Sequence, residues 1–121
     1  MLYLSGVLPV IGHEAKFIGR LGRELTLEQG REAARLATLN ALAVARNDLG
    51  SLDTVARVVK LTIYMATELD FVALPKVADA SSELLRDVFG TDNLPVRMVL
   101  GVAILPLGVP VAVEAVFEVA G

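Results

Sequence analysis

Arg97 lies near the start of an otherwise apolar stretch, residues 95–102, that has the composition of a buried strand. A full positive charge is costly to bury unless an anion pairs with it. A guanidinium group stays charged at any working pH and offers two parallel N–H donors to a planar carboxylate. We therefore expect Arg97 either to bind the carboxylate of a small ligand or to form an ion pair with Glu114 or Glu118.

Few other residue types in this sequence offer chemistry. Cysteine is absent, which excludes disulfides, thiolate catalysis and cysteine ligands to a metal. The only histidine, His13, follows Gly12 in a turn pattern, and we expect it to be exposed. Residues 19–23 have Gly-x-x-Gly spacing with two arginines, but they lack the strand-to-helix setting of a phosphate loop and predict a basic turn.

The charge balance argues against a nucleic-acid partner. Lys and Arg number 11 and Asp and Glu number 14, so the net charge at pH 7 is -3 and no basic stripe is expected. Met1 runs directly into a strand-like segment without a basic leader, which predicts a cytoplasmic protein.

The hydrophobic content predicts an oligomer rather than a membrane protein. Hydrophobic residues make up 55% of the chain, so we expect a small fold to bury part of this surface between subunits. The uncharged stretch 98–113 is shorter than the roughly 20 residues of a spanning helix. It is also interrupted by Gly101, Pro106, Gly108 and Pro110, which predicts two strands and a turn.

The first half of the chain predicts two strands and a helix. Residues 2–5 and 15–18 are short apolar segments around a loop and read as a pair of strands. Thr26 and Gln29 have the spacing of a capping box, which begins a helix. Gly50 provides the left-handed conformation that ends this helix.

The second half predicts three strands and a second helix. Residues 55–66 are rich in β-branched residues and form the clearest strand. Asp70 is expected to cap a helix that ends at Phe89, with Pro75 in or near its first turn. Two final strands, 97–104 and 111–119, are expected to form a hairpin.

These elements predict one α+β domain spanning residues 1–121, in the order ββαβαββ. We expect a mixed sheet with both helices on one face, so that the other face meets solvent or a partner subunit. In the last two strands the uncovered face is expected to carry Arg97, Val99, Gly101 and Ala103 beside Ala112, Glu114, Val116 and Glu118.

Short segments along almost the whole chain carry a family resemblance, in order and with similar spacing. They are Leu4–Pro9, Asn40, Val58–Tyr64, Asp70–Phe71, Leu94–Arg97, Leu105–Pro106 and Val113–Ala115. Together they resemble the RidA/YjgF family, formerly called the L-PSP endoribonuclease family. Residues 30–43 and 77–88 are similar to a branch whose members mostly lack an assigned role.

The resemblance implies a chorismate-mutase-like fold assembled as a homotrimer, with small carboxylate molecules bound in clefts between subunits. The best-understood members hydrolyse enamines and imines of the 2-aminoacrylate type to 2-oxo acids and ammonia, without a metal or an organic cofactor. The ribonuclease activity in the older family name finds no support in an acidic chain with only 2 tyrosines and 4 phenylalanines.

The same resemblance implies a set of site residues. Arg97 matches the family's carboxylate-binding arginine, and Ser5 and Gly6 stand where the backbone approaches the ligand. Glu114 matches a carboxylate on the last strand; it is expected either to hold the attacking water or to pair with an arginine. Val99 stands where the family often has a cysteine near the ligand.

Departures from the family pattern bear on the chemistry. Ala112 occupies the position of the deaminases' water-holding glutamate, and a methyl group neither accepts nor donates a proton. A leading segment that usually supplies an edge strand and a tyrosine is absent from this sequence. The sequence therefore predicts a trimeric binder of 2-oxo or imino acids, either with deaminase activity or as a non-catalytic ligand sensor or interaction module.

Overall fold

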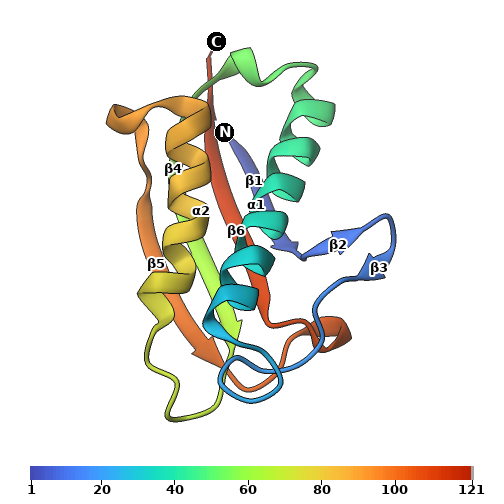
Figure 1. Ribbon diagram of the computed structural model, residues 1–121. Coiled ribbons are helices and arrows are strands. Elements are labelled where there is room, and N and C mark those ends of the chain that lie inside the picture. The colour runs from blue at the N-terminus through green and yellow to red at the C-terminus, as the bar shows by residue number, and fades with distance from the viewer. Residues whose placement is uncertain (121) are drawn as a thin grey trace.

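Four strands form one mixed sheet in the computed structural model, which describes residues 1–120 (Figure 1). The order across the sheet is β1, β6, β4, β5, with the bounds β1 (Leu2–Val7), β4 (Val55–Ala66), β5 (Val96–Val102) and β6 (Val111–Val119). Strand β5 runs parallel to β4, whereas β6 is antiparallel to both of its neighbours. Two short strands, β2 (Val10–Ile11) and β3 (Glu14–Ala15), form a separate hairpin.

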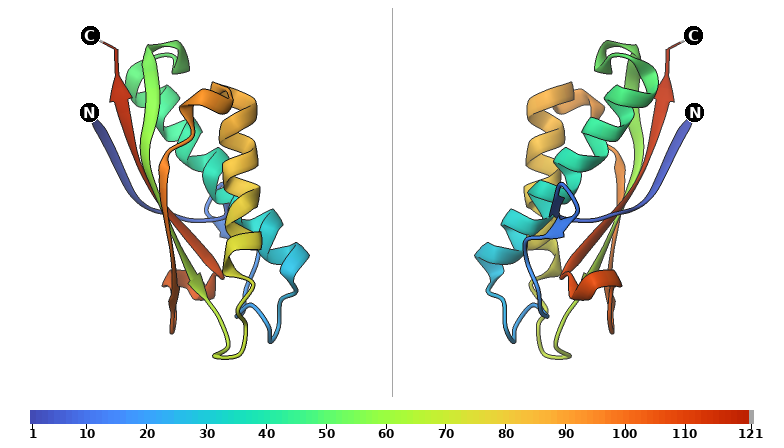
Figure 2. Two further views of the ribbon diagram at one scale, coloured as in Figure 1. Left: turned by 90° about the vertical axis from the view of Figure 1, so that its left-hand side faces the viewer. Right: turned by 90° about the vertical axis from the view of Figure 1, so that its right-hand side faces the viewer.

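Both helices, α1 (Leu27–Leu49) and α2 (Leu74–Phe89), cover the same face of the sheet, as the two edge-on views in Figure 2 show. This arrangement confirms the predicted α+β class and the two-helix layer. In residues 1–120 neither helix combines the length and the apolar character that a membrane span requires.

The ends of the helices follow the local sequence. The Thr26 side chain accepts a hydrogen bond from the Gln29 backbone while the Gln29 side chain accepts one from the Thr26 backbone, which confirms the capping box. Gly50 has φ 84° and ends α1 in the left-handed region, as predicted. Helix α2 begins at Leu74 instead of at Asp70, with Ala73 at its cap position and Pro75 in its first turn.

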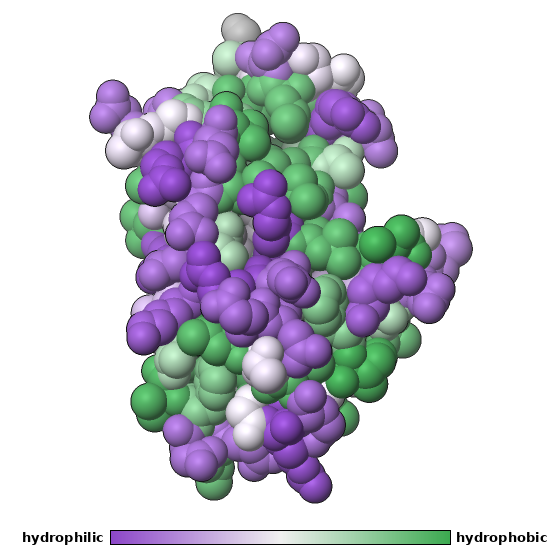
Figure 3. All heavy atoms as spheres, viewed as in Figure 1, coloured by the Kyte–Doolittle hydropathy of each residue, from purple (hydrophilic) through white to green (hydrophobic). Residues whose placement is uncertain are grey.

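The core lies between the helices and the covered face of the sheet. Most of its strand residues alternate toward the helices, and the large, fully buried ones are Val58, Leu61, Ile63, Met65, Val111, Val113 and Phe117. Small residues bring α1 and α2 close together, where the buried Thr38 hydroxyl donates to Ser81 Oγ or to the Ala34 carbonyl oxygen. Figure 3 views this helix side, where hydrophilic residues gather over the helices.

Two predicted strand pairings are wrong. Strand β1 pairs with β6, and only Ala15 of the segment 15–18 is in a strand. The last two strands form no hairpin, because β4 lies between them. A helix between β4 and β5 makes a crossover connection, which favours a parallel pair and leaves β5 at the edge.

The sheet face opposite the helices is apolar and has no cover within residues 1–120. Large side chains on this face are strongly exposed: Tyr3 by 72%, Val96 by 74%, Met98 by 50% and Leu100 by 41%. Neighbouring exposed apolar side chains of this kind are typical of interaction surfaces. The expectation that this face meets solvent or a partner subunit stays a prediction.

Candidate functional site

The predicted site residues lie in two groups at opposite edges of the sheet. Ser5 and Gly6 belong to edge strand β1, and Glu114 lies beside them on β6. Arg97 and Val99 belong to the other edge strand, β5. Three strand spacings of about 4.8 Å separate these edges by roughly 14 Å, which is too far for a small ligand to contact both within one chain.

The first group forms a hollow on the uncovered face. Ser5 Oγ donates a hydrogen bond to Glu114 Oε2 at 3.3 Å. The hollow has a volume of about 280 Å³ and is also lined by Tyr3 and Lys60, neither of which the sequence singled out. It therefore combines a carboxylate, a hydroxyl and an ammonium group. Gly6, at φ 72°, lies where the β1–β6 register shifts, a conformation that favours glycine.

Asn40 holds the chain that follows this hollow. Its Nδ2 donates to the carbonyl oxygens of Leu8 and Val10, both at 2.8 Å, and thereby ties the end of β1 to helix α1. An amide side chain supplies two donors at once, so Asn40 fixes two backbone positions with one residue.

The second group faces the helices, so its predicted placement on the uncovered face is wrong. Arg97 is in register with Leu61 and Val99 with Ile63, and both of these β4 residues are buried under the helices. The prediction assumed that β5 pairs with β6, and it assigned the side chains of β5 to a face on that basis. Glu114 and Ala112 do lie on the uncovered face, as predicted, because Glu114 pairs with Thr62, next to Leu61.

Arg97 forms an ion pair, but with a different residue than expected. Its Nη1 donates to Asp79 Oδ1 at 2.9 Å and to Ser82 Oγ at 3.1 Å, both on α2. Glu118, one of the predicted partners, instead pairs with Arg57 at 3.3 Å. The side chain of Arg97 stays 27% exposed, and its Nε and Nη2 donate to no residue in 1–120. The edge of the Arg97 guanidinium formed by Nε and Nη2 is therefore available to a ligand.

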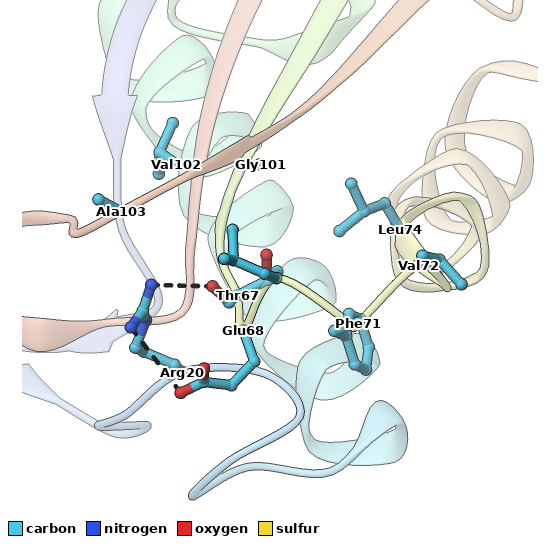
Figure 4. A pocket seen from close by; sticks show the side chains of 10 residues that line it. Arg20, Thr67, Glu68, Phe71, Val72, Leu74, Gly101, Val102 and Ala103 are labelled. Atoms are coloured by element: carbon cyan, nitrogen blue, oxygen red, sulfur yellow. Dashed lines mark hydrogen bonds and ion pairs between the residues drawn. The ribbon is translucent and has the colours of Figure 1, made fainter.

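A third group of polar residues was missed by the sequence analysis. A cleft of about 540 Å³ lies beyond the C-terminal ends of β4 and β5, and Figure 4 shows Arg20, Thr67 and Glu68 at one end of it. The arginine comes from the Gly-x-x-Gly stretch, which forms a turn as predicted. The segment that contacts it, Thr67–Glu68, lies more than 40 residues later, and no local signal joins the two.

Metal binding finds no support in the geometry of residues 1–120. No group of three or more His, Asp or Glu side chains there is placed to hold an ion. His13, expected to be exposed, is exposed.

The fold and the placement of these residues define an α+β protein of the chorismate-mutase-like type. A sequence model of the family described as "YjgF/chorismate mutase-like, putative endoribonuclease" matches residues 1–119. The chain belongs to this family, which confirms the resemblance seen in the sequence. It is 37% identical over 118 residues to Protein TCP17 of Trypanosoma cruzi, covering 97% of this chain and 74% of that protein.

Solved structures give the same fold at two levels of similarity. The protein Atu1372 of Agrobacterium tumefaciens, with unknown function, is 31% identical, with a TM-score of 0.94 over 98% of this chain and 76% of that chain. RidA from the Antarctic bacterium Psychrobacter sp. is 24% identical, with a TM-score of 0.65 over 97% of this chain and 79% of that chain. The backbone is therefore much more similar to Atu1372 than to this RidA.

Proposed function

We propose that the chain forms a cytoplasmic homotrimer that binds a small 2-oxo or 2-imino acid between subunits. Arg97 of one copy holds the ligand carboxylate, Ser5 and Gly6 of the next copy approach it through the backbone, and Val99 supports Arg97 from the same strand. Glu114 holds the attacking water. Residues 1–121 act as one domain in this assembly.

The observation that carries this proposal is the position of the two groups on opposite edges of one sheet. Contact between the β5 edge of one copy and the β1 edge of the next would bring the strand that carries Arg97 beside the strand that carries Ser5. The long Arg97 side chain, which leaves its own sheet on the helix side, would reach the Ser5–Glu114 hollow around that edge. Such a contact joins two different surfaces, and three contacts of this type close into a ring when each one rotates the next copy by a third of a turn. The apolar face that carries Met98 and Leu100 would then be buried inside the ring.

The chemistry of this site is the hydrolysis of an imine. Water adds to C2 of the imino acid, a proton moves to the nitrogen, and ammonia leaves as the 2-oxo acid forms. Glu114 is the carboxylate that takes the proton from water, and the Ser5 hydroxyl orients it. No cofactor takes part in this sequence of steps.

One observation favours a non-catalytic alternative, in which the same site acts as a ligand sensor or an interaction module. Ala112 is 4% exposed and lies two residues before Glu114 on the same face, about 7 Å away along the strand. A site that has lost a carboxylate there keeps the binding groups but has lower catalytic power.

The test uses freshly generated 2-aminoacrylate, with ammonia release as the readout. The wild type is expected to accelerate release over buffer, and Arg97→Ala to abolish the acceleration because the substrate carboxylate loses its anchor. Arg57→Ala is the matched control, since Arg57 is an exposed, ion-paired arginine of the same sheet. It is expected to retain activity.

The same assay separates the two candidate functions. If the wild type gives no acceleration but binds 2-oxobutyrate through Arg97, the protein is a sensor, and Ala112→Glu is then expected to create activity. If Arg97→Ala changes neither binding nor activity, Arg97 is structural and the proposed site is wrong.

A further inference from the structure

The cleft at the C-terminal ends of β4 and β5 is separate from the proposed carboxylate site. Its floor includes Gly101, four residues after Arg97, which corresponds to about 13 Å along the strand. Arg97, Ser5 and Glu114 do not line it. Its volume of about 540 Å³ falls within the range of small-molecule sites.

The walls of the cleft are apolar. Phe71 and Val72 come from the segment between β4 and α2, Leu74 is the first residue of α2, and Val102 is the last residue of β5 (Figure 4). Gly101 leaves the floor open, because an added Cβ would lie 3.5 Å from Thr67 Oγ1 and 3.8 Å from Leu74 Cδ1. An apolar side chain of a ligand would replace water along these walls.

The polar end of the cleft holds two opposite charges that are only loosely paired. Arg20 Nη2 donates to the Thr67 carbonyl oxygen at 2.9 Å, but Arg20 Nη1 is 3.8 Å from Glu68 Oε1. The Glu68 carboxylate accepts no hydrogen bond from residues 1–120; its other cation, Arg23, lies at 3.5 Å. Arg20 Nε also lacks an acceptor.

Arg20 and Glu68 both line the cleft, and their side chains are 35% and 30% exposed, although the unpaired atoms Arg20 Nε and Glu68 Oε1 are themselves buried. A ligand in the cleft would therefore pair with the accessible parts of these two charged groups, not with the buried atoms. A ligand that satisfies both must carry an anionic acceptor and a cationic donor close together, next to an apolar body.

We propose that this cleft binds a zwitterion with an apolar side chain, as in an apolar α-amino acid. The ligand carboxylate lies against Arg20, its ammonium group against Glu68, and its side chain along Phe71 and Leu74. The site goes beyond the proposed function and does not depend on Arg97 or on assembly.

The test measures binding of three probes by titration calorimetry and by the amide NMR signals of Gly101 and Thr67. The probes are L-leucine, 4-methylpentanoate, which lacks the ammonium group, and 3-methylbutylamine, which lacks the carboxylate. L-Leucine is expected to shift both signals and to bind at least tenfold more tightly than either analogue. No binding of leucine, or equal binding of an analogue, would overturn the proposal.

Variants locate the site. Arg20→Gln is expected to weaken leucine binding at least tenfold, and Glu68→Gln to remove the preference for leucine over 4-methylpentanoate. Gly101→Val places its Cβ at ordinary contact distance from Thr67 and Leu74 and adds two methyl groups beyond it, and it is expected to abolish binding without unfolding the chain. Arg97→Ala and Arg57→Gln are expected to leave binding unchanged. Undiminished leucine binding in Gly101→Val, or loss of binding in Arg97→Ala, contradicts the placement.

Discussion

Both faces of the sheet carry large apolar side chains, yet within residues 1–120 only one face is covered. On the helix side Phe117 is 1% exposed and Ile63 is fully buried, whereas on the other side Leu100 is 41% and Met98 50% exposed. Burial of apolar area stabilises a fold wherever water is removed. The covered face therefore determines whether the chain folds, and in the proposed assembly the uncovered face determines whether copies associate.

The largest expected effect comes from the covered face. Phe117→Ala leaves a cavity between the sheet and the helices and is expected to lower the free energy of unfolding by about 3–5 kcal/mol. Urea unfolding at low protein concentration measures this loss. Leu100→Ala is the matched control, for which we expect less than about 1 kcal/mol under the same conditions. Equal losses would abolish the distinction between the faces.

Charged substitutions test whether copies associate through the uncovered face. Met98→Lys together with Leu100→Lys places two ammonium groups where we expect subunits to meet, and burial of unpaired charge is costly. The double variant is expected to sediment as a monomer while its circular dichroism stays native, against a trimer for the wild type. A monomeric wild type, or a double variant of unchanged mass, contradicts the role assigned to this face.

The smallest expected effect is on ligand affinity at Arg97, where Asp79 of α2 and the ligand carboxylate compete for one guanidinium. Asp79 already occupies Nη1 of Arg97 at 2.9 Å, so an incoming carboxylate meets a partly neutralised guanidinium. Asp79→Asn is expected to tighten 2-oxobutyrate binding about threefold to tenfold, while stability changes by at most about 1 kcal/mol. Glu83 lies on the same helix as Asp79, and Glu83→Gln, which removes its ion pair to Arg31 of α1, serves as the control.

A weaker or unchanged affinity in Asp79→Asn would show that Asp79 does not compete with the ligand. Calorimetry at two salt concentrations supplies the check, because competition between carboxylates is electrostatic and falls as salt screens the charges.

Local features of this fold could be predicted from the sequence. The Thr26–Gln29 cap, the Gly50 helix end and Pro75 in the first turn of α2 each depend on a few neighbouring residues. The layer of two helices on a mixed sheet followed from the order of elements. These features need no knowledge of which strands pair.

Pairing across the sheet could not be predicted in the same way. Arg97 was assigned to the wrong face because β5 was taken as the neighbour of β6, and the face of an edge strand depends on its true neighbour. Strand β4 has register shifts between Val55 and Arg57 and between Val58 and Lys60, which break a strict alternation. The cleft at Arg20 was also missed, because Arg20 and Thr67 are more than 40 residues apart in the sequence.

We place the carboxylate site between two copies, and a mixture of two variants tests this placement. Arg97→Ala removes one half of the site, and Ser5→Phe fills the hollow of the other half. Each variant alone is expected to lose 2-oxobutyrate binding. Subunits unfolded together and refolded as mixed trimers are expected to regain part of it, because some interfaces then combine an intact Arg97 with an intact Ser5. Mixed trimers that bind no better than either parent would contradict the account.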